Sequence, residues 1–266
     1  MLITDPDVLA AAPLETLDSL TLSEPNITDL SPLRRAVGLT RLVLNEMGPV
    51  DITPLTACSR LVQLSIYDTP VADFSPLMAL PALRELTVGA TAPGPSSIPL
   101  AFPPWLTTLS LFVGEPHNDL SAIQHLTGLE HLSVYGGTVV GDGLCSLSSL
   151  TRLQLTHTAT PDLSFLSALP QLADFWSMES RLVDLSGLAG ATELRRLLLG
   201  HNHIADISPL AGLLHLDRLG LRANRIAVLP PLSLPALRTR EPVAVGQSGR
   251  RSHTAGASQG PPGRST

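Results

Sequence analysis

The stretch "LRRLLLGHNHIADISPLAGLLHL", residues 194–216, decides the fold, because its leucine spacing recurs along most of the chain. It opens with the pattern LxxLxL and ends on the leucine that begins the next copy. Ten leucines begin such copies: Leu17, Leu39, Leu61, Leu83, Leu106, Leu129, Leu150, Leu172, Leu194 and Leu216. Successive copies start 22 residues apart, except for two steps of 23 and one of 21, so the chain is a regular internal repeat.

Each copy combines a strand pattern with a turn pattern. The fourth and sixth positions of LxxLxL are apolar and alternate with polar ones, which is typical of a strand with one buried face. A second block, as in "ITDLSPL" and "IADISPL", indicates a reversal into a helical turn. We expect the hydroxyl before each proline to cap the turn, as N-cap residues do, at Ser31, Thr53, Ser75 and Ser208. We also expect the recurring aspartates, spaced one unit apart, to cap these turns rather than to act in catalysis: Asp29, Asp51, Asp73, Asp162, Asp184 and Asp206.

At this copy number the pattern resembles the leucine-rich repeat family, in the 22-residue class found in internalins and in the regulatory subunit of protein phosphatase 1. The resemblance implies an α/β solenoid, a right-handed array with a parallel β-sheet on its concave face and short 3-10 or turn segments on its convex face. It also implies that a protein partner binds the concave face, at positions 3, 5, 7 and 8 of each unit.

The repeat divides the chain into three parts. Residues 1–16 resemble the second half of a worn partial repeat, and residues 17–237 form a leucine-rich repeat domain of about ten units. Residues 238–266 are rich in Gly, Ser, Pro and Arg, so we expect a disordered tail. Neither end of the array carries a recognisable polar cap, which solenoids normally need. The chain is therefore either a stand-alone protein or part of a once larger one.

Composition and charge exclude several function classes. The net charge of -6 argues against nucleic acid as the main partner, since phosphate binding depends on clustered basic residues. All 17 basic residues are arginine, so Schiff-base chemistry and a lysine P-loop are excluded within this chain. Cys58 and Cys145 stand 87 positions apart without a CxxC partner, which favours a reducing compartment. With no signal peptide or membrane span in the sequence, we expect a cytoplasmic location.

The candidate partner-binding residues lie at positions whose side chains point away from the core. Position 7 holds Tyr67, Phe112, Tyr135 and Met178, and position 5 adds Trp176. Aromatic side chains dominate interface energetics, so we expect them to be hot spots. The charged candidates are acidic in the first three units and basic in the last four: Asp18, Glu24, Glu46 and Asp68, then Arg152, Arg196, Arg218 and Arg222. Two alternatives remain: the aromatics are ordinary surface residues, or Ser177 produces a bulge that turns Trp176 inward.

No catalytic motif of the GxSxG, HExxH or GxGxxG type occurs in the chain. The cluster "GHNHIAD", residues 200–206, could suggest a metal site, but the repeat places His201, His203 and Asp206 on different parts of one unit. We therefore predict a non-catalytic, monomeric protein-interaction scaffold with no cofactor, metal, nucleic acid or membrane partner. The alternatives are the C-terminal sensor or autoinhibitory portion of a larger NACHT-type signalling NTPase, or a truncated fragment of one.

Overall fold

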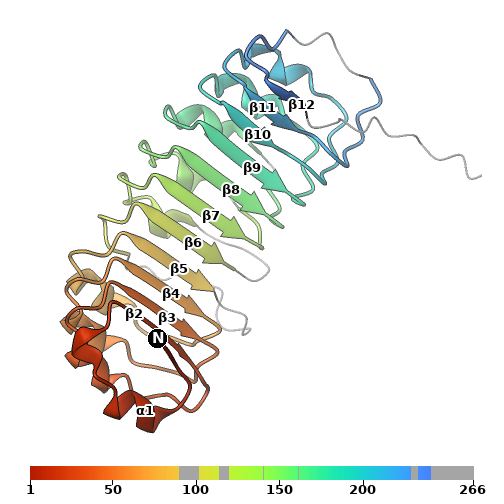
Figure 1. The fold of residues 1–266 in the computed structure, drawn as a ribbon. Helices are drawn as coiled ribbons and strands as arrows, with labels where there is room; N and C mark the ends of the chain where they lie inside the picture. Colours follow the sequence, from red (N-terminus) through yellow and green to blue (C-terminus); the bar gives the residue numbers. More distant parts are fainter. Residues whose placement is uncertain (90–101, 114–119, 140, 161, 229–232, 241–266) are drawn as a thin grey trace, which may run out of the picture.

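The computed structural model describes residues 1–89, 102–113, 120–139, 141–160, 162–228 and 233–240. These residues form one parallel sheet of 12 strands, each paired with the next in sequence order. Figure 1 shows the strands stacked side by side along a curved row, with the turns on the opposite side. The strands are β1 (Leu2–Ile3), β2 (Ser19–Ser23), β3 (Arg41–Asn45), β4 (Gln63–Tyr67), β5 (Glu85–Gly89), β6 (Thr108–Phe112), β7 (His131–Tyr135), β8 (Arg152–Thr156), β9 (Asp174–Met178), β10 (Arg196–Leu198), β11 (Arg218–Gly220) and β12 (Thr239–Arg240). The predicted leucine-rich repeat solenoid is confirmed.

The sheet is in register with the repeat. From β2 to β9, strands span positions 3 to 7 of their units, and equivalent positions pair directly, as Leu42 with Leu64 and Asn45 with Tyr67. Leucines at position 4, such as Leu64, and residues at position 6, such as Ile66, are buried. Because one face of each strand is buried, a slip of one residue would turn the core side chains of that strand toward solvent. The cost of exposing them fixes the register.

The convex side is built from short 3-10 helices. They are η1 (Leu14–Thr16), η2 (Ser31–Arg35), η3 (Thr53–Ala57), η4 (Ser75–Ala79), η5 (Leu120–Ile123), η6 (Gly141–Leu144), η7 (Ser164–Ala168), η8 (Ser186–Gly190) and η9 (Ser208–Gly212). The predicted hydroxyl caps are wrong, because Ser31, Thr53, Ser75 and Ser208 are the first helical residues and the residues before them make no side-chain cap. The predicted capping by the aspartate two residues upstream is confirmed: the carboxylate of Asp206 accepts hydrogen bonds from the Ser208 N–H and hydroxyl, both at 2.8 Å.

The two ends of the array extend the sheet beyond the ten predicted units. Residues 1–16 contain β1, which pairs with β2, and the helix α1 (Pro6–Ala11), which buries Leu9. Asp5 caps this helix by accepting a hydrogen bond from the Asp7 N–H at 2.7 Å. The sequence predicts only the turn half of a unit there, so the strand is an addition. At the other end β12 pairs with β11, two residues past the predicted end of the array. The predicted tail lies outside the described residues from 241 onward.

Within the described ranges, none of the helices has both the length and the apolar composition needed to cross a bilayer. The buried side chains form a continuous core along the array, and most of them are leucines. The fold therefore leaves one long sheet face, the concave face, on which positions 3, 5 and 7 of the units carry varied side chains.

Candidate functional site

Three aromatic side chains of the concave face contact one another across four strands. The rings of Phe112 on β6 and Tyr135 on β7 are stacked, with centroids 4.4 Å apart and planes 7° from parallel. Tyr67 on β4 meets Phe112 edge to face, at 6.0 Å and 70°. The strand between them, β5, carries Gly89 at the same position, so no side chain separates the two rings. We call Tyr67, Phe112 and Tyr135 the aromatic ladder.

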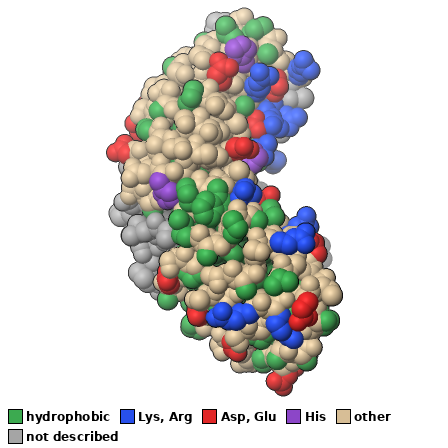
Figure 2. All heavy atoms as spheres, turned by 90° about the vertical axis from the view of Figure 1, so that its left-hand side faces the viewer, with side chains coloured by type: hydrophobic (Ala, Val, Ile, Leu, Met, Phe, Trp, Pro, Cys, Tyr) green, Lys and Arg blue, Asp and Glu red, His purple; other side chains and the backbone are tan. Residues whose placement is uncertain are grey.

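Gly89 leaves room for this contact. A Cβ at that position would lie 3.1 Å from Tyr67 Cδ1 and 3.5 Å from Phe112 Cβ, so the Tyr67 ring would have to shift by a few tenths of an ångström. Phe112 remains 38% exposed although it contacts a ring on each side. Figure 2 shows apolar side chains gathered near the middle of the molecule, beside the hollow on its right-hand edge. The aromatic ladder is thus exposed and held by its own contacts.

A second cluster occupies strands β8 to β10. Asp174 is buried, and its carboxylate accepts hydrogen bonds from Arg196 Nε and Nη2, both at 2.6 Å, and from Arg152 Nε at 3.2 Å. The bonds from Arg196 to Asp174 raise the pKa of that guanidinium. The Arg152 guanidinium lies 5.7 Å from the ring centre of Trp176, within the range of a cation–π contact. We call Arg152, Asp174, Trp176 and Arg196 the Asp174 cluster.

The register of β9 excludes the bulge considered for Trp176. Trp176 pairs with Gln154 and Leu198, and Asp174 and Met178 keep equivalent partners, so the strand is regular. Ser177 points into the core, where its hydroxyl has no hydrogen-bond partner among the described residues, and neither has the buried Trp176 Nε1. Trp176 is half-buried on the concave face, against Arg152.

The other predicted site residues lie on the same face but are not all brought together. Met178 is 37% exposed at the end of β9, and Arg218 and Arg222 are exposed on and just after β11. Glu46 and Asp68 follow β3 and β4, at the opposite end from these arginines. The expected charge segregation is incomplete, because the basic half also contains Asp174 and the acidic half contains Arg41, residues that the sequence reasoning did not select.

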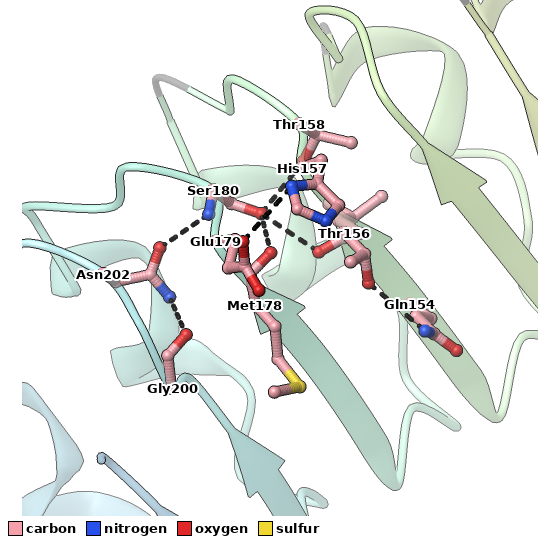
Figure 3. A network of polar contacts seen from close by, with 10 residues as sticks. Gln154, Thr156, His157, Thr158, Met178, Glu179, Ser180, Gly200 and Asn202 are labelled. Atoms are coloured by element: carbon pink, nitrogen blue, oxygen red, sulfur yellow. Dashed lines mark hydrogen bonds and ion pairs between the residues drawn. The ribbon is translucent and has the colours of Figure 1, made fainter. Parts of the chain in front are cut away.

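The edge of the concave face has unusual backbone geometry. At position 8, non-glycine residues have positive φ: Glu46, Asp68, His157, Glu179, His201 and Ala223. Such left-handed conformations cost L-residues about 1 kcal/mol each. At this edge His157 Nδ1 lies 3.5 Å from Glu179 Oε2, and both side chains are more than half exposed (Figure 3). Among the described residues, no group of three His, Cys, Asp or Glu side chains could hold a metal ion.

Asn202, at position 9 of its unit, bonds the backbone next to this edge. Its side-chain oxygen Oδ1 accepts hydrogen bonds from the N–H groups of Ser180 and Leu182, at 2.9 and 3.1 Å. Its amide donates to the Ser177 carbonyl of the preceding unit at 2.6 Å and to the Leu199 and Gly200 carbonyls of its own unit; Figure 3 shows the bond to Gly200. Asn202 therefore joins the backbone of its own turn to that of the preceding unit. Within "GHNHIAD", Asn202 is buried, His201 is exposed at the concave edge, and Asp206 caps η9.

The six convex aspartates all act alike. Each accepts a hydrogen bond from the backbone N–H two residues on, at 2.8 Å: Asp29, Asp51, Asp73, Asp162, Asp184 and Asp206. Hydrogen bonds from that Ser or Thr lower the pKa of every one of these carboxyls below the ordinary 3.8. A carboxyl held ionised as a turn cap is a poor proton donor, so these groups are structural.

The chemistry of the two cysteines is also limited. Burial raises the pKa of the Cys58 thiol to about 11, which leaves very little thiolate at neutral pH. Cys145 is exposed and donates weakly to the Gly141 carbonyl.

The chain was compared with known proteins. No protein-family model and no curated protein sequence matches it. An internalin from Listeria monocytogenes, InlF, has a TM-score of 0.63 and 26% identity, over 81% of this chain and 63% of the internalin. A leucine-rich repeat protein from Leptospira interrogans has a TM-score of 0.52 and 21% identity, over 81% and 63%. A chain of the Drosophila Toll–Spatzle complex has a TM-score of 0.56 and 15% identity, over 79% and 37%.

The match to the internalin combines fold and sequence, whereas the other two show the fold alone. This chain spans 63% of the length of the internalin, and less of the Toll–Spatzle chain. The ten registered copies of LxxLxL and the parallel sheet of 12 strands agree with these structures. The chain is therefore a leucine-rich repeat protein with internalin-like repeats.

Proposed function

We propose that this protein is a non-catalytic scaffold that binds a protein partner on its concave face. The aromatic ladder is the observation that carries the proposal. Three ring side chains, of which Phe112 is 38% exposed and the two tyrosines are half-buried, lie in contact near the middle of the face. Buried aromatic anchors provide most of the binding energy of many interfaces, and a partner that covers Tyr67, Phe112 and Tyr135 gains their desolvation.

Pre-organisation strengthens this proposal. Phe112 is packed between Tyr67 and Tyr135, so its ring loses little conformational freedom when a partner covers it. Ordering a side chain at an interface otherwise costs about 0.5–1.5 kcal/mol. The sheet beneath is held by parallel pairing on both sides of β6, which keeps the ring spacing constant. The aromatic ladder is therefore a suitable rigid centre for an interface.

Charge at the two ends would orient the partner. Glu46 and Asp68 lie towards the N-terminal end, and Arg218 and Arg222 lie towards the C-terminal end. In Figure 2 basic side chains line the upper, C-terminal half of the hollowed edge. Charge complementarity of this kind mainly sets the association rate and the orientation of a partner. A structure with this fold comes from the Toll–Spatzle complex, which supports protein binding as a use of the fold.

The expected setting of the scaffold is part of the same proposal. We infer a monomer in the cytoplasm that needs no cofactor, and a partner that is neither nucleic acid nor membrane. The sensor portion of a NACHT-type NTPase has no observation in its favour here. Sequencing the DNA upstream of Met1 distinguishes the two, since an open frame with a P-loop would support the sensor.

The proposal is tested on an identified partner. Affinity capture from the native cell with mass spectrometry provides the candidate, and titration calorimetry with the purified proteins measures the affinity. We expect Tyr135→Ala and Trp176→Ala each to weaken binding about 30-fold while the thermal melt stays cooperative. Val183→Ala, at an exposed side chain outside the strands, is the control and should leave the affinity unchanged. Equal affinity of all three variants and the parent would reject the concave site.

A further inference from the structure

The position-3 side chains of four neighbouring strands form an ordered row of charges. Arg152 pairs with Asp174 across β8 and β9, Asp174 with Arg196 across β9 and β10, and Arg196 with Arg218 across β10 and β11. Neighbouring strands lie about 4.8 Å apart, so each charge lies close to the next. The order along the row is positive, negative, positive, positive.

Asp174 shows what a carboxylate does in this row. It lies between two arginines one strand away on either side, and it accepts from both. The pair with Arg196 uses Nε and Nη2 of one guanidinium, the forked geometry that favours carboxylates. The spacing of parallel strands therefore suits a carboxylate held between position-3 arginines.

The last two residues of the row, Arg196 and Arg218, are both positive and have no carboxylate between them. Arg196 and Arg218 are direct cross-strand neighbours, an arrangement of like charges that is unfavourable. Arg218 is exposed and makes no ion pair or side-chain hydrogen bond with any described residue. Asp217 raises the pKa of Arg196 at longer range but forms no ion pair with it. Exposed Arg222, on the same face just beyond β11, adds to the positive charge.

Trp176 provides a second, independent feature beside this row. Its Nε1 is buried without a hydrogen-bond partner among the described residues, although buried indole N–H groups usually have one. Its ring faces the Arg152 guanidinium at 5.7 Å. Trp176 therefore lies beside the row of charges, where its emission reports a ligand bound to the arginines.

We propose that an acidic segment of a protein partner binds here, with a carboxylate side chain bridging Arg196 and Arg218. This inference rests on the proposed scaffold function and specifies the chemistry of its partner. Arg196 and Arg218 lie opposite each other on adjacent strands, so one carboxylate spans both, and Arg196 bonds Asp174 through Nε and Nη2 only, which leaves its Nη1 donors for a ligand. A nucleic acid is disfavoured, because the chain carries a net charge of -6 and Glu46 and Asp68 lie on the same face.

The test uses synthetic probes on the full chain. Acetylated and amidated hexaglutamate is titrated while tryptophan emission is recorded, with hexaglutamine as the uncharged control. Hexaglutamate should bind and change the emission, and hexaglutamine should do neither. Arg218→Gln should weaken the hexaglutamate affinity about tenfold, because it removes one half of the bridge. Arg41→Gln is the matched control, since Arg41 is an exposed position-3 arginine on β3, and its affinity should stay within about twofold of the parent.

The choice of Arg218→Gln over Arg196→Gln separates a loss of binding from a loss of stability. Arg196→Gln breaks the pair with buried Asp174 and can lower stability, whereas Arg218→Gln changes an exposed side chain and should melt like the parent. Trp176→Phe should remove most of the emission change and preserve hexaglutamate binding in calorimetry.

Three outcomes would overturn the inference: no hexaglutamate binding, equal loss in Arg41→Gln and Arg218→Gln, or tighter binding of inorganic phosphate or a thymidine oligonucleotide. The scaffold proposal would survive any of these if Tyr135→Ala still weakened the native partner. If hexaglutamate bound as expected while Tyr135→Ala left the partner unaffected, the aromatic ladder alone would be rejected as the site.

Discussion

The convex turns and the concave face of the same units differ in how closely they repeat. On the convex side, one arrangement of an aspartate and the first residue of a 3-10 helix recurs six times with the same 2.8 Å hydrogen bond. On the concave face, position 7 changes from Tyr67 to Gly89 to Phe112 on successive strands. Repetition indicates positions that hold the array together, and variation indicates positions that are free to recognise a partner. Changes at repeated positions should therefore alter stability, and changes on the varied face should alter binding.

The largest effect on stability is expected at Asn202. Asn202→Ala removes both acceptor bonds to Ser180 and Leu182 and leaves several backbone groups unpaired inside the array. The free energy of unfolding should fall by about 3 kcal/mol, as measured by urea denaturation. Asn26→Ala, at an exposed asparagine that bonds only Glu24, is the control and should change it little. A loss below about 1 kcal/mol for Asn202→Ala would contradict the structural role of position 9.

A substitution at Ser177 tests the buried face of strand β9. Its hydroxyl lies in the core without a partner among the described residues, where most other units carry Leu, Ile or Val. Ser177→Ala should raise the free energy of unfolding by about 1 kcal/mol, because an unsatisfied buried hydroxyl is costly. Ser133→Ala, at a half-buried concave position, should have a smaller effect. A destabilised Ser177→Ala variant would show that the hydroxyl has a partner after all.

The aspartate caps predict a pH dependence of stability. Because hydrogen bonds lower the pKa of these carboxyls in the folded chain below the ordinary 3.8, their contribution is present above that value. It is lost as the pH falls through the folded pKa. The urea concentration at the midpoint of unfolding should therefore decrease as the pH is lowered from about 5 to about 3. Asp184→Asn removes one cap and should reduce this drop. An unchanged pH profile in Asp184→Asn would assign the acid sensitivity to other groups.

The smallest effect is expected where the backbone is left-handed. Ala223 has a φ of 55°, so Ala223→Gly relieves an unfavourable conformation but adds unfolded-state freedom. The net gain should be about 0.5 kcal/mol in thermal denaturation. Ala79→Gly, at an exposed residue of η4, should be destabilising instead. If both glycine variants lost stability, the left-handed geometry at position 8 would be in doubt.

Most of the fold follows from the spacing of leucines, since a period of 22 residues sets both the strands and their register. The sequence predicts both an aspartate and a hydroxyl as caps of the regular turns, and only the geometry shows that the carboxylate accepts while the hydroxyl donates to it. The repeat predicts which positions of each unit lie on the concave face, but it does not predict which side chains on that face contact one another. Asp174 lies in the same column as the selected arginines, so a reading of position 3 for opposite charges would have found it. The contact of Tyr67 with Phe112 across Gly89 depends on ring orientations, which spacing alone does not determine.

The most direct test of the account compares one residue from each side of the array. Phe112 on β6 and Met78 on η4 are similarly exposed, at 38% and 45%, and neither is a charged or capping residue. For both alanine variants, the melting temperature and the affinity for the captured partner are measured together. The account predicts that Phe112→Ala weakens binding about 30-fold and Met78→Ala does not, while both variants melt close to the parent. Equal affinities for the two variants, or a loss confined to Met78→Ala, would contradict recognition by the concave face.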